Sequence, residues 1–338
     1  MTVSPQTTIV LDNAKPPRRV SWRNFRQRLV WSNLRFSMRA GKVLVWVYLF
    51  LITINYGVLG LMKHQIDANP QFQAIDVPTN GSAAVANAVA LMDRELNLHG
   101  WTPNDPWFAP SGILDNMPNF QIGVINAVGR FSFEMLDQIG RRSGSSSADP
   151  DLERASGFLQ YPPNIWVWEP STSFLPAVPS ERQYRQGQAA LESYNVRLSR
   201  GQAVFERRAD TLAAVLSRIS DNVGSQTAQI DKAQNSGWLM FSQAADDVFY
   251  QNKGTMYAYD IILTSLGADF ATVIQENNLV PIWDQALKSL RQGSQLRPAV
   301  VLNGQSDRSI FANHLALQGF AMKRAILQIE EIVSVLEV

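Results

Sequence analysis

Residues 43–62 form a run of twenty residues without a charged side chain, VLVWVYLFLITINYGVLGLM. A helix of this length spans about 30 Å, which is the thickness of the hydrocarbon core of a bilayer. Twelve of the twenty residues are Leu, Ile, Val or Phe, which favour insertion, and a buried core helix seldom reaches this length without a charge. We therefore predict one membrane-spanning helix. Its predicted anchoring residues include Val43, Leu44, Trp46, Phe50, Ile54 and Leu59.

Charges flank this run unequally. Seven Lys or Arg residues lie between Arg19 and Lys42, whereas only Lys63 and His64 follow the run before Asp67. The positive-inside rule predicts a cytoplasmic N-terminus and an exported body. The basic segment 1–42 is too long for the first region of a cleavable signal peptide, so we expect a signal anchor that stays attached.

Two interpretations of the basic segment stay open. Residues 21–39 place Trp22, Phe25, Leu29 and Phe36 near helical spacing among five arginines, which is typical of an amphipathic helix on an anionic leaflet. The alternative is a disordered tail that only determines topology.

Composition narrows the classes of function that remain. The absence of cysteine excludes thiol catalysis, iron–sulfur clusters and disulfides. The first 62 residues carry nine Lys or Arg and one acidic residue, and the rest carry 21 basic and 28 acidic residues, which argues against a body that binds nucleic acid. No nucleotide-binding, zinc-protease or serine-hydrolase motif is present. We expect no cofactor, and the sequence leaves a metal site undecided.

The spacing of apolar residues predicts an all-α, or mainly α, body at residues 81–338, joined to the anchor by a linker at 63–80. Long Pro-rich loops are expected at 101–119 and 161–179, because prolines interrupt regular helix there. Ser82 is the predicted cap of the first helix. Further helices are expected near 121–141, 151–158, from Ser180, from Ser236 with a break or kink at Gly254, from Pro281, and at 310–336, with a short strand at 300–302.

The longest predicted helix begins at Ser180. Leu191, Leu198, Phe205, Leu212 and Ile219 recur every seven residues. This spacing favours one continuous helix packed in a bundle or hairpin, and an inter-chain coiled coil is the alternative.

Acidic residues are the main candidates for chemistry. Asp105 and Asp115 flank the first Pro-rich loop, and Asp246 and Asp247 are expected within a helix. A pair of these carboxylates would suit acid–base catalysis, and Asp115, Asp247 and His314 would suit a hard metal. The simpler alternative is that the loop aspartates cap helices or turns and that Asp247 bonds to the loop. The candidate functional surface comprises Asp105, Trp107, Asp115, Asn116, Asn119, Asp246, Asp247 and His314.

Aromatic residues gather in the two Pro-rich loops, namely Trp101, Trp107, Phe108, Trp166 and Trp168. We expect them to pack the loops onto the helices, and the alternative is an exposed surface that binds glycans or peptides.

Four strings, GWTPNDPWF, ILDNMPNFQIGV, FSQAADDVFY and NHLALQGF, resemble a proteobacterial family of inner-membrane proteins of unknown function. The resemblance covers about residues 63–338. It implies one N-terminal span and an exported helical body in a Gram-negative periplasm, and it assigns no catalytic residue.

These observations predict an interaction protein of the bacterial cell envelope, anchored in the inner membrane with its body in the periplasm. Its expected partners are the bilayer, with an anionic leaflet for the basic segment, and an envelope protein or a second copy of the chain. Two alternatives stay open: a tethered hydrolase that acts on cell-wall or glycan substrates through Asp carboxylates, and a body that binds a solute or lipid.

Overall fold

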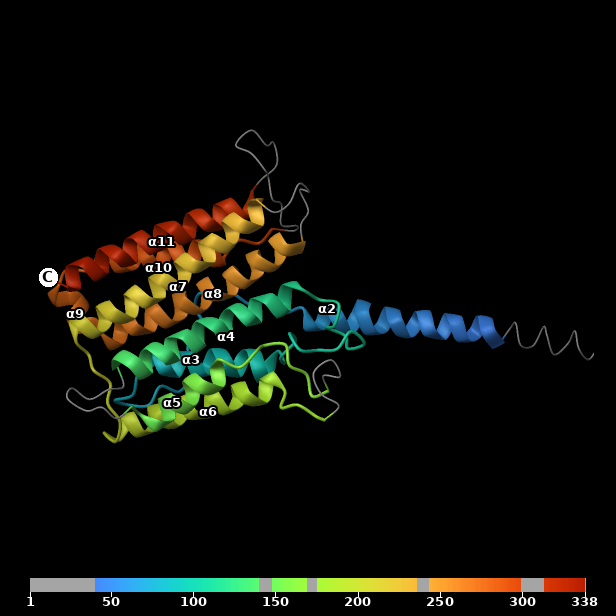
Figure 1. Ribbon diagram of the computed structural model, residues 1–338, viewed down its shortest axis with the longest axis horizontal. Coiled ribbons are helices and arrows are strands. Elements are labelled where there is room, and N and C mark those ends of the chain that lie inside the picture. Colours follow the sequence, from blue (N-terminus) through green and yellow to red (C-terminus); the bar gives the residue numbers. More distant parts are fainter. Residues whose placement is uncertain (1–39, 140–147, 169–174, 236–242, 299–312, 338) are drawn as a thin grey trace, which may run out of the picture. The chain divides into compact units, whose positions relative to one another are not determined.

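The computed structural model describes residues 40–139, 148–168, 175–235, 243–298 and 313–337 (Figure 1). These residues contain helices and no strand, which confirms the all-α prediction. The predicted strand at 300–302 and the predicted amphipathic segment 21–39 lie outside them. The chain divides into two compact units, residues 1–54 and 55–338.

Ala40–Lys63 is the one helix among the described residues that is long and apolar enough to cross a membrane. It includes the π-helical segment η1 (Thr53–Leu59) and the short helix α2 (Gly60–Lys63). Length and composition therefore agree with the predicted anchor.

The second unit is a bundle of helices joined by loops. Its elements are α3 (Ala83–Asp93), η2 (Arg94–Leu98), α4 (Asn116–Glu134), η3 (Met135–Ile139), α5 (Pro150–Leu159), α6 (Ser180–Ser199), α7 (Ala209–Asn235), α8 (Gln243–Asp269), α9 (Ala271–Glu276), α10 (Val280–Ser294) and α11 (His314–Leu336).

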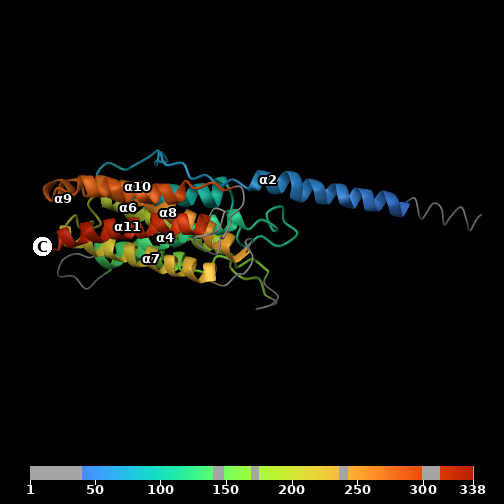
Figure 2. The same ribbon diagram turned by 90° about the horizontal axis from the view of Figure 1, so that it is seen from above.

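Helix α8 is the centre of this bundle. It packs against α4 and α3 on one side and against α10, α7 and α11 on the other, while α5 and α6 cover α3 and α4 (Figures 1 and 2). The core is apolar and aromatic, and Phe120, Phe131, Tyr257 and Leu266 are among its fully buried side chains.

Two glycines allow α4 and α8 to meet backbone to backbone. A Cβ atom added at Gly123 would lie 2.0 Å from the Gln251 carbonyl oxygen, and one at Gly254 would lie 2.1 Å from that of Phe120. The Thr255 hydroxyl donates to the Gly123 carbonyl oxygen (3.1 Å) at the same crossing. Of the predicted break or kink at Gly254, the break is wrong, because this glycine serves a close helix contact within a continuous helix.

The predicted continuous helix from Ser180 is also wrong. It ends at Ser199, where Gly201 adopts a φ of 68° and the Gln202 amide donates to the Arg197 carbonyl oxygen (2.8 Å). A left-handed glycine with this bonding ends a helix. The chain then begins α7, so the seven-residue register joins two helices, and the buried Phe205 lies in the connection between them.

Side chains cap several helix starts, one of which was predicted. Ser82 Oγ accepts the Val85 amide at the start of α3 (3.2 Å), as expected. Asp149 caps α5, and Asn313 caps α11. Helix α4 begins at Asn116, five residues before the predicted start, because Pro118 falls in the first turn, where a missing N–H costs nothing.

Candidate functional site

Five residues of the predicted surface come together where the first turns of α4 and α8 lie side by side. They are Asp115, Asn116, Asn119, Asp246 and Asp247. Asn119 Nδ2 donates to Asp247 Oδ1 (2.7 Å). The side-chain amide nitrogen of Asn116, oriented toward Asp115 and Asp246, donates to Asp115 Oδ1 (3.1 Å) and to Asp246 Oδ2. We call these five residues the acidic group.

The carboxylates of the acidic group repel one another. Partial burial, together with Asp115 and Asp247, raises the pKa of Asp246 to about 6, and the pKa of Asp247 is also raised by burial and by Asp115. Helix geometry offsets part of this repulsion, because anions are favoured at the N-terminal ends of helices. Asp115 caps α4 by accepting the Asn116 amide (2.9 Å), which agrees with its simpler predicted role.

The other predicted residues lie in different surroundings. Asp105 accepts the Ser111 hydroxyl inside the first Pro-rich loop, and its charged neighbours are Lys63 and Glu181. Burial raises the pKa of Asp105 despite the Ser111 hydrogen bond. His314 is the first residue of α11. The structure therefore unites Asp115 with Asp246 and Asp247, while Asp105 has a separate set of partners.

The proposed metal set finds no support. Within the described ranges, no three His, Asp or Glu residues lie in an arrangement that would hold a metal ion.

Aromatic residues of the Pro-rich loops divide into two groups. Trp101 is buried as expected, with its indole N–H donating to the Pro163 carbonyl oxygen (3.0 Å) and its ring 5.0 Å from that of Tyr184. Most of the others are exposed, against expectation: 77% of Trp107, 54% of Phe108 and 57% of Trp168 are open to solvent, and the nearby aliphatic Ile113 is 60% exposed. Phe108 contacts Trp107 and Trp166 edge to face, at 5.8 and 5.9 Å between ring centroids. We call Trp107, Phe108, Ile113 and Trp166 the end patch.

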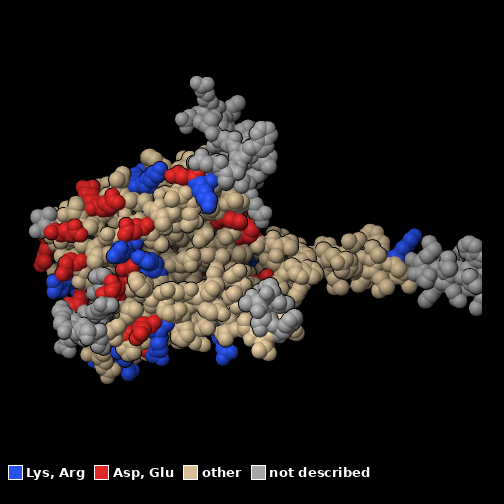
Figure 3. All heavy atoms as spheres, in the orientation of Figure 1, with Lys and Arg blue, Asp and Glu red and all other residues tan. Residues whose placement is uncertain are grey.

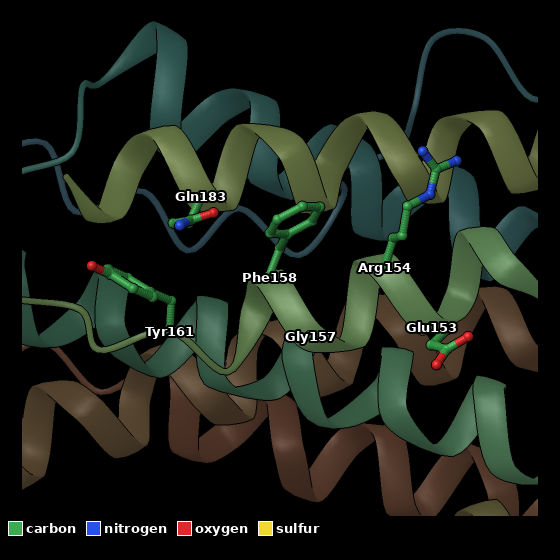
Figure 4. A pocket seen from close by; sticks show the side chains of 6 residues that line it. All are labelled: Glu153, Arg154, Gly157, Phe158, Tyr161 and Gln183. Carbon is green, nitrogen blue, oxygen red and sulfur yellow. The ribbon is translucent and has the colours of Figure 1, made fainter. Parts of the chain in front are cut away.

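Surface hollows on the body are open and partly polar. Figure 4 shows one of about 420 Å³ between α5 and α6, in which Phe158 points toward α6 and Tyr161 faces Gln183. A second, of about 640 Å³, has a mostly polar lining that includes Arg130, Asn222 and Gln226. Neither is an enclosed apolar cavity of the kind that the solute- or lipid-binding alternative needs.

Helix α11 carries an exposed apolar face that the sequence reading did not single out. Leu317, Phe320 and Leu327 are 54%, 65% and 66% exposed, and Val335 is also exposed. We call these four residues the α11 stripe. The sequence could have indicated this stripe, because α11 has apolar residues on two opposite faces. Leu315, Met322 and Ile329 are buried on the face opposite the stripe.

A buried lysine and a buried polar network were also missed. Lys253 Nζ donates to the carbonyl oxygens of Ser294 and Leu296 (both 2.6 Å), and burial lowers its pKa to about 8. Arg94 pairs with Glu95 (2.8 Å) and donates to the Tyr257 hydroxyl (2.8 Å). Glu95 is the next residue in the chain, but no sequence pattern places Arg94 beside Tyr257 or Lys253 beside Ser294 and Leu296, because these partners are distant in sequence.

Comparison with known sequences identifies a family. Residues 60–241 and 231–337 match the profile of DUF2333, described as an uncharacterized protein conserved in bacteria. No curated protein and no solved structure matches the chain. Since the match covers almost all of the body, the chain belongs to this bacterial family.

Proposed function

We propose that the chain is a membrane-anchored interaction protein of the bacterial cell envelope, with its N-terminus in the cytoplasm and its body in the periplasm. The α11 stripe is the surface that binds its protein partner. The observation that carries this proposal is the exposure of four large apolar side chains along one helix.

The α11 stripe is unusual because α11 already buries one apolar face against α7 and α10. A helix that only covers a core presents polar residues to water on its outer side. Arg324 lies over the Phe320 ring, 5.4 Å from its centroid, so the stripe combines aromatic, aliphatic and cationic groups. Aromatic residues and arginine are enriched at the centres of protein interfaces.

Envelope placement rests on the apolar helix and its flanks. The helix is long enough to span a bilayer, and the basic residues precede it. The bacterial family supports a bacterial membrane. Digestion of the body by protease added to spheroplasts, but not to intact cells, would test this orientation, and a body protected in spheroplasts would contradict it.

The binding proposal is tested by extracting the full chain in mild detergent and identifying what co-purifies. A photo-crosslinking residue at Phe320 should capture one protein in a stoichiometric complex. The double substitution of Phe320 and Leu327 to serine should abolish the complex. Val280→Ser, at an exposed apolar residue on α10 outside the stripe, is the control and should preserve the complex.

Two results would contradict the proposal: a chain that remains a bare monomer, or a complex that survives the double substitution. If the captured protein is a second copy of the chain, the stripe is a homo-oligomer interface, which is the other form of partner that we expect.

One observation favours a second candidate function, a hydrolase of cell-wall or glycan substrates. In the acidic group, a carboxyl with a pKa of about 6 lies beside two further carboxylates. A protonated acid next to an ionised base is what glycoside hydrolysis requires. Purified full chain should then release fragments from peptidoglycan, and Asp246→Asn and Asp115→Asn should each stop the release. No release from the wild-type chain would remove this candidate.

A further inference from the structure

We propose that the end patch inserts into the bilayer interface on the body's side of the membrane. This inference rests on the proposed membrane anchor, is independent of the α11 stripe, and adds a second membrane contact to that of the anchor. The body then rests on the membrane through its first Pro-rich loop.

Hydrogen bonds join this loop to the apolar run itself. Asn55 Nδ2 donates to the Phe108 carbonyl oxygen (3.1 Å), and the Tyr56 hydroxyl donates to the Trp107 carbonyl oxygen (2.6 Å). The two backbones also approach closely further along, since a Cβ atom added at Gly60 would lie 2.9 Å from the Pro110 carbonyl oxygen. All of these residues belong to the same compact unit.

The position of Asn55 and Tyr56 sets the depth of the loop. They precede Met62, the last residue of the apolar run, by seven and six residues. At 1.5 Å per residue this distance is about 10 Å along the helix. A loop bonded to these side chains therefore lies at the depth of the interface or just below it.

The chemistry of the loop fits this depth. Irregular backbone is costly in lipid unless its polar groups are bonded, and the carbonyl groups of Trp107 and Phe108 are bonded by the anchor. The Asn55 amide is satisfied by the same contact. Exposed Trp and Phe side chains favour the bilayer interface, and burial of Ile113 adds apolar contact.

Charge is compatible with the same orientation. The loop from Trp101 to Asp115 contains no Lys or Arg, Asp105 is bonded to Ser111, and Asp115 caps α4. On the face drawn in Figure 3, most acidic and basic side chains gather toward the end of the body that holds α9, and the surface nearer α2 is mostly uncharged.

A bilayer is a better occupant than a protein, because the end patch is continuous with a segment that itself requires lipid. A protein partner at this place would have to displace lipid around Asn55 and Tyr56. The proposal therefore commits to phospholipid.

The natural absence of cysteine allows a direct test on the full chain. Single substitutions Trp107→Cys, Ile113→Cys and Val280→Cys would each carry a nitroxide label, in phospholipid vesicles at a low protein-to-lipid ratio. Labels at 107 and 113 should be more accessible to oxygen than to a water-soluble nickel chelate. The label at 280, at an exposed apolar position on α10 outside the α11 stripe, should show the reverse.

Greater nickel than oxygen accessibility at both 107 and 113 would overturn the proposal. So would label-to-label distances that show the patch is covered by a second copy of the chain. Both results are interpretable, because Trp107 and Ile113 are exposed and a label at either position should leave the buried core intact.

A second set of variants tests the role of the anchor contacts. In the Trp107→Cys chain, Asn55→Ala combined with Tyr56→Phe should shift the label toward water. Thr53→Ala is the control, because its hydroxyl bonds only to the Leu49 carbonyl oxygen of its own helix (2.9 Å), and it should leave the label in lipid. An unchanged label in the double variant would overturn the assignment of Asn55 and Tyr56 as the groups that hold the loop.

Discussion

The two halves of α8 place their carboxylates in opposite settings. In the C-terminal half, Asp260 is fully buried and accepts two hydrogen bonds from Arg291 (both 3.0 Å), and Asp269 accepts the amides of Ala83 and Ala84 and the Ser82 hydroxyl. In the N-terminal half, Asp246 and Asp247 face Asp115 across amide side chains. The carboxylates in the C-terminal half bind helices together, whereas those in the N-terminal half repel one another and oppose folding.

The largest effect is expected from breaking the buried pair in the C-terminal half. Arg291→Leu leaves Asp260 buried without its cation, which costs about 3–5 kcal/mol of unfolding free energy at neutral pH. Burial already raises the pKa of Asp260, so protonation at low pH should reduce the loss. Denaturant unfolding measures both effects. Lys288→Leu, at an exposed position on the same helix, should change little, and an equal loss in both variants would contradict the assigned role.

A somewhat smaller effect is expected at Gly254, which separates the two halves. Gly254→Ala places a methyl group against the Phe120 carbonyl oxygen of α4 and should cost about 2–3 kcal/mol, because two backbones must separate. Gly224→Ala in α7 meets open space and should stabilise the protein by about 1 kcal/mol through helix propensity. Thermal unfolding compares the two variants, and shifts of the same sign would exclude the backbone contact as the cause.

Asp269 should show an intermediate loss. Asp269→Ala removes three hydrogen bonds at the first turn of α3, including two to backbone amides, at a cost of about 1–2 kcal/mol. Ser82→Ala, which removes one of these bonds and the cap, should cost less. Urea unfolding that ranks the two variants in reverse order would contradict this account.

The smallest effect, of opposite sign, is expected in the N-terminal half. The pKa of Asp246 in the folded protein is about 6, above its ordinary value of 3.8. The folded state therefore retains a proton that the unfolded state releases, and the protein loses stability as pH rises through this window. Asp246→Asn should remove this loss and stabilise the protein at pH 7 by about 1 kcal/mol, after allowance for solvent screening.

Unfolding of wild type and Asp246→Asn between pH 4 and 7 tests that sign. Asp284→Asn, at an exposed position on α10, should keep the wild-type pH dependence. A variant that is less stable than wild type at pH 7 would show that the acidic group does not oppose folding.

The sequence predicted correctly those features of the fold that depend only on residues close together in the chain. The cap at Ser82, the loops rich in proline and the all-α class each follow from a few adjacent side chains and are confirmed. Gly254 was misread as a break because its function depends on Phe120, more than 130 residues earlier in the chain. The helix from Ser180 was extended too far because the apolar register continues past Gly201, although the backbone turns there.

The candidate site divides in the same way. Asp246 and Asp247 were identified as two adjacent acidic residues within a predicted helix. Their approach to Asp115 and Asn119 depends on the parallel packing of α4 and α8. The exposure of Trp107 and Trp168 was not predicted, because a Pro-rich loop has the same composition whether it covers a core or projects from it. The contacts of Lys253 with Ser294 and Leu296 and of Arg94 with Tyr257 have no local signal, since these partners are distant in sequence.

The central contact between α4 and α8 also dictates when the body can fold during synthesis. Residues 116–134 reach their main partner only after the chain has been made through residue 269, because α5, α6 and α7 intervene. Until then α4 exposes its apolar face and its glycine groove, which makes the growing chain prone to aggregation. A chain truncated after α7 should therefore require a chaperone or rapid degradation, whereas one truncated within α11 retains the central contact.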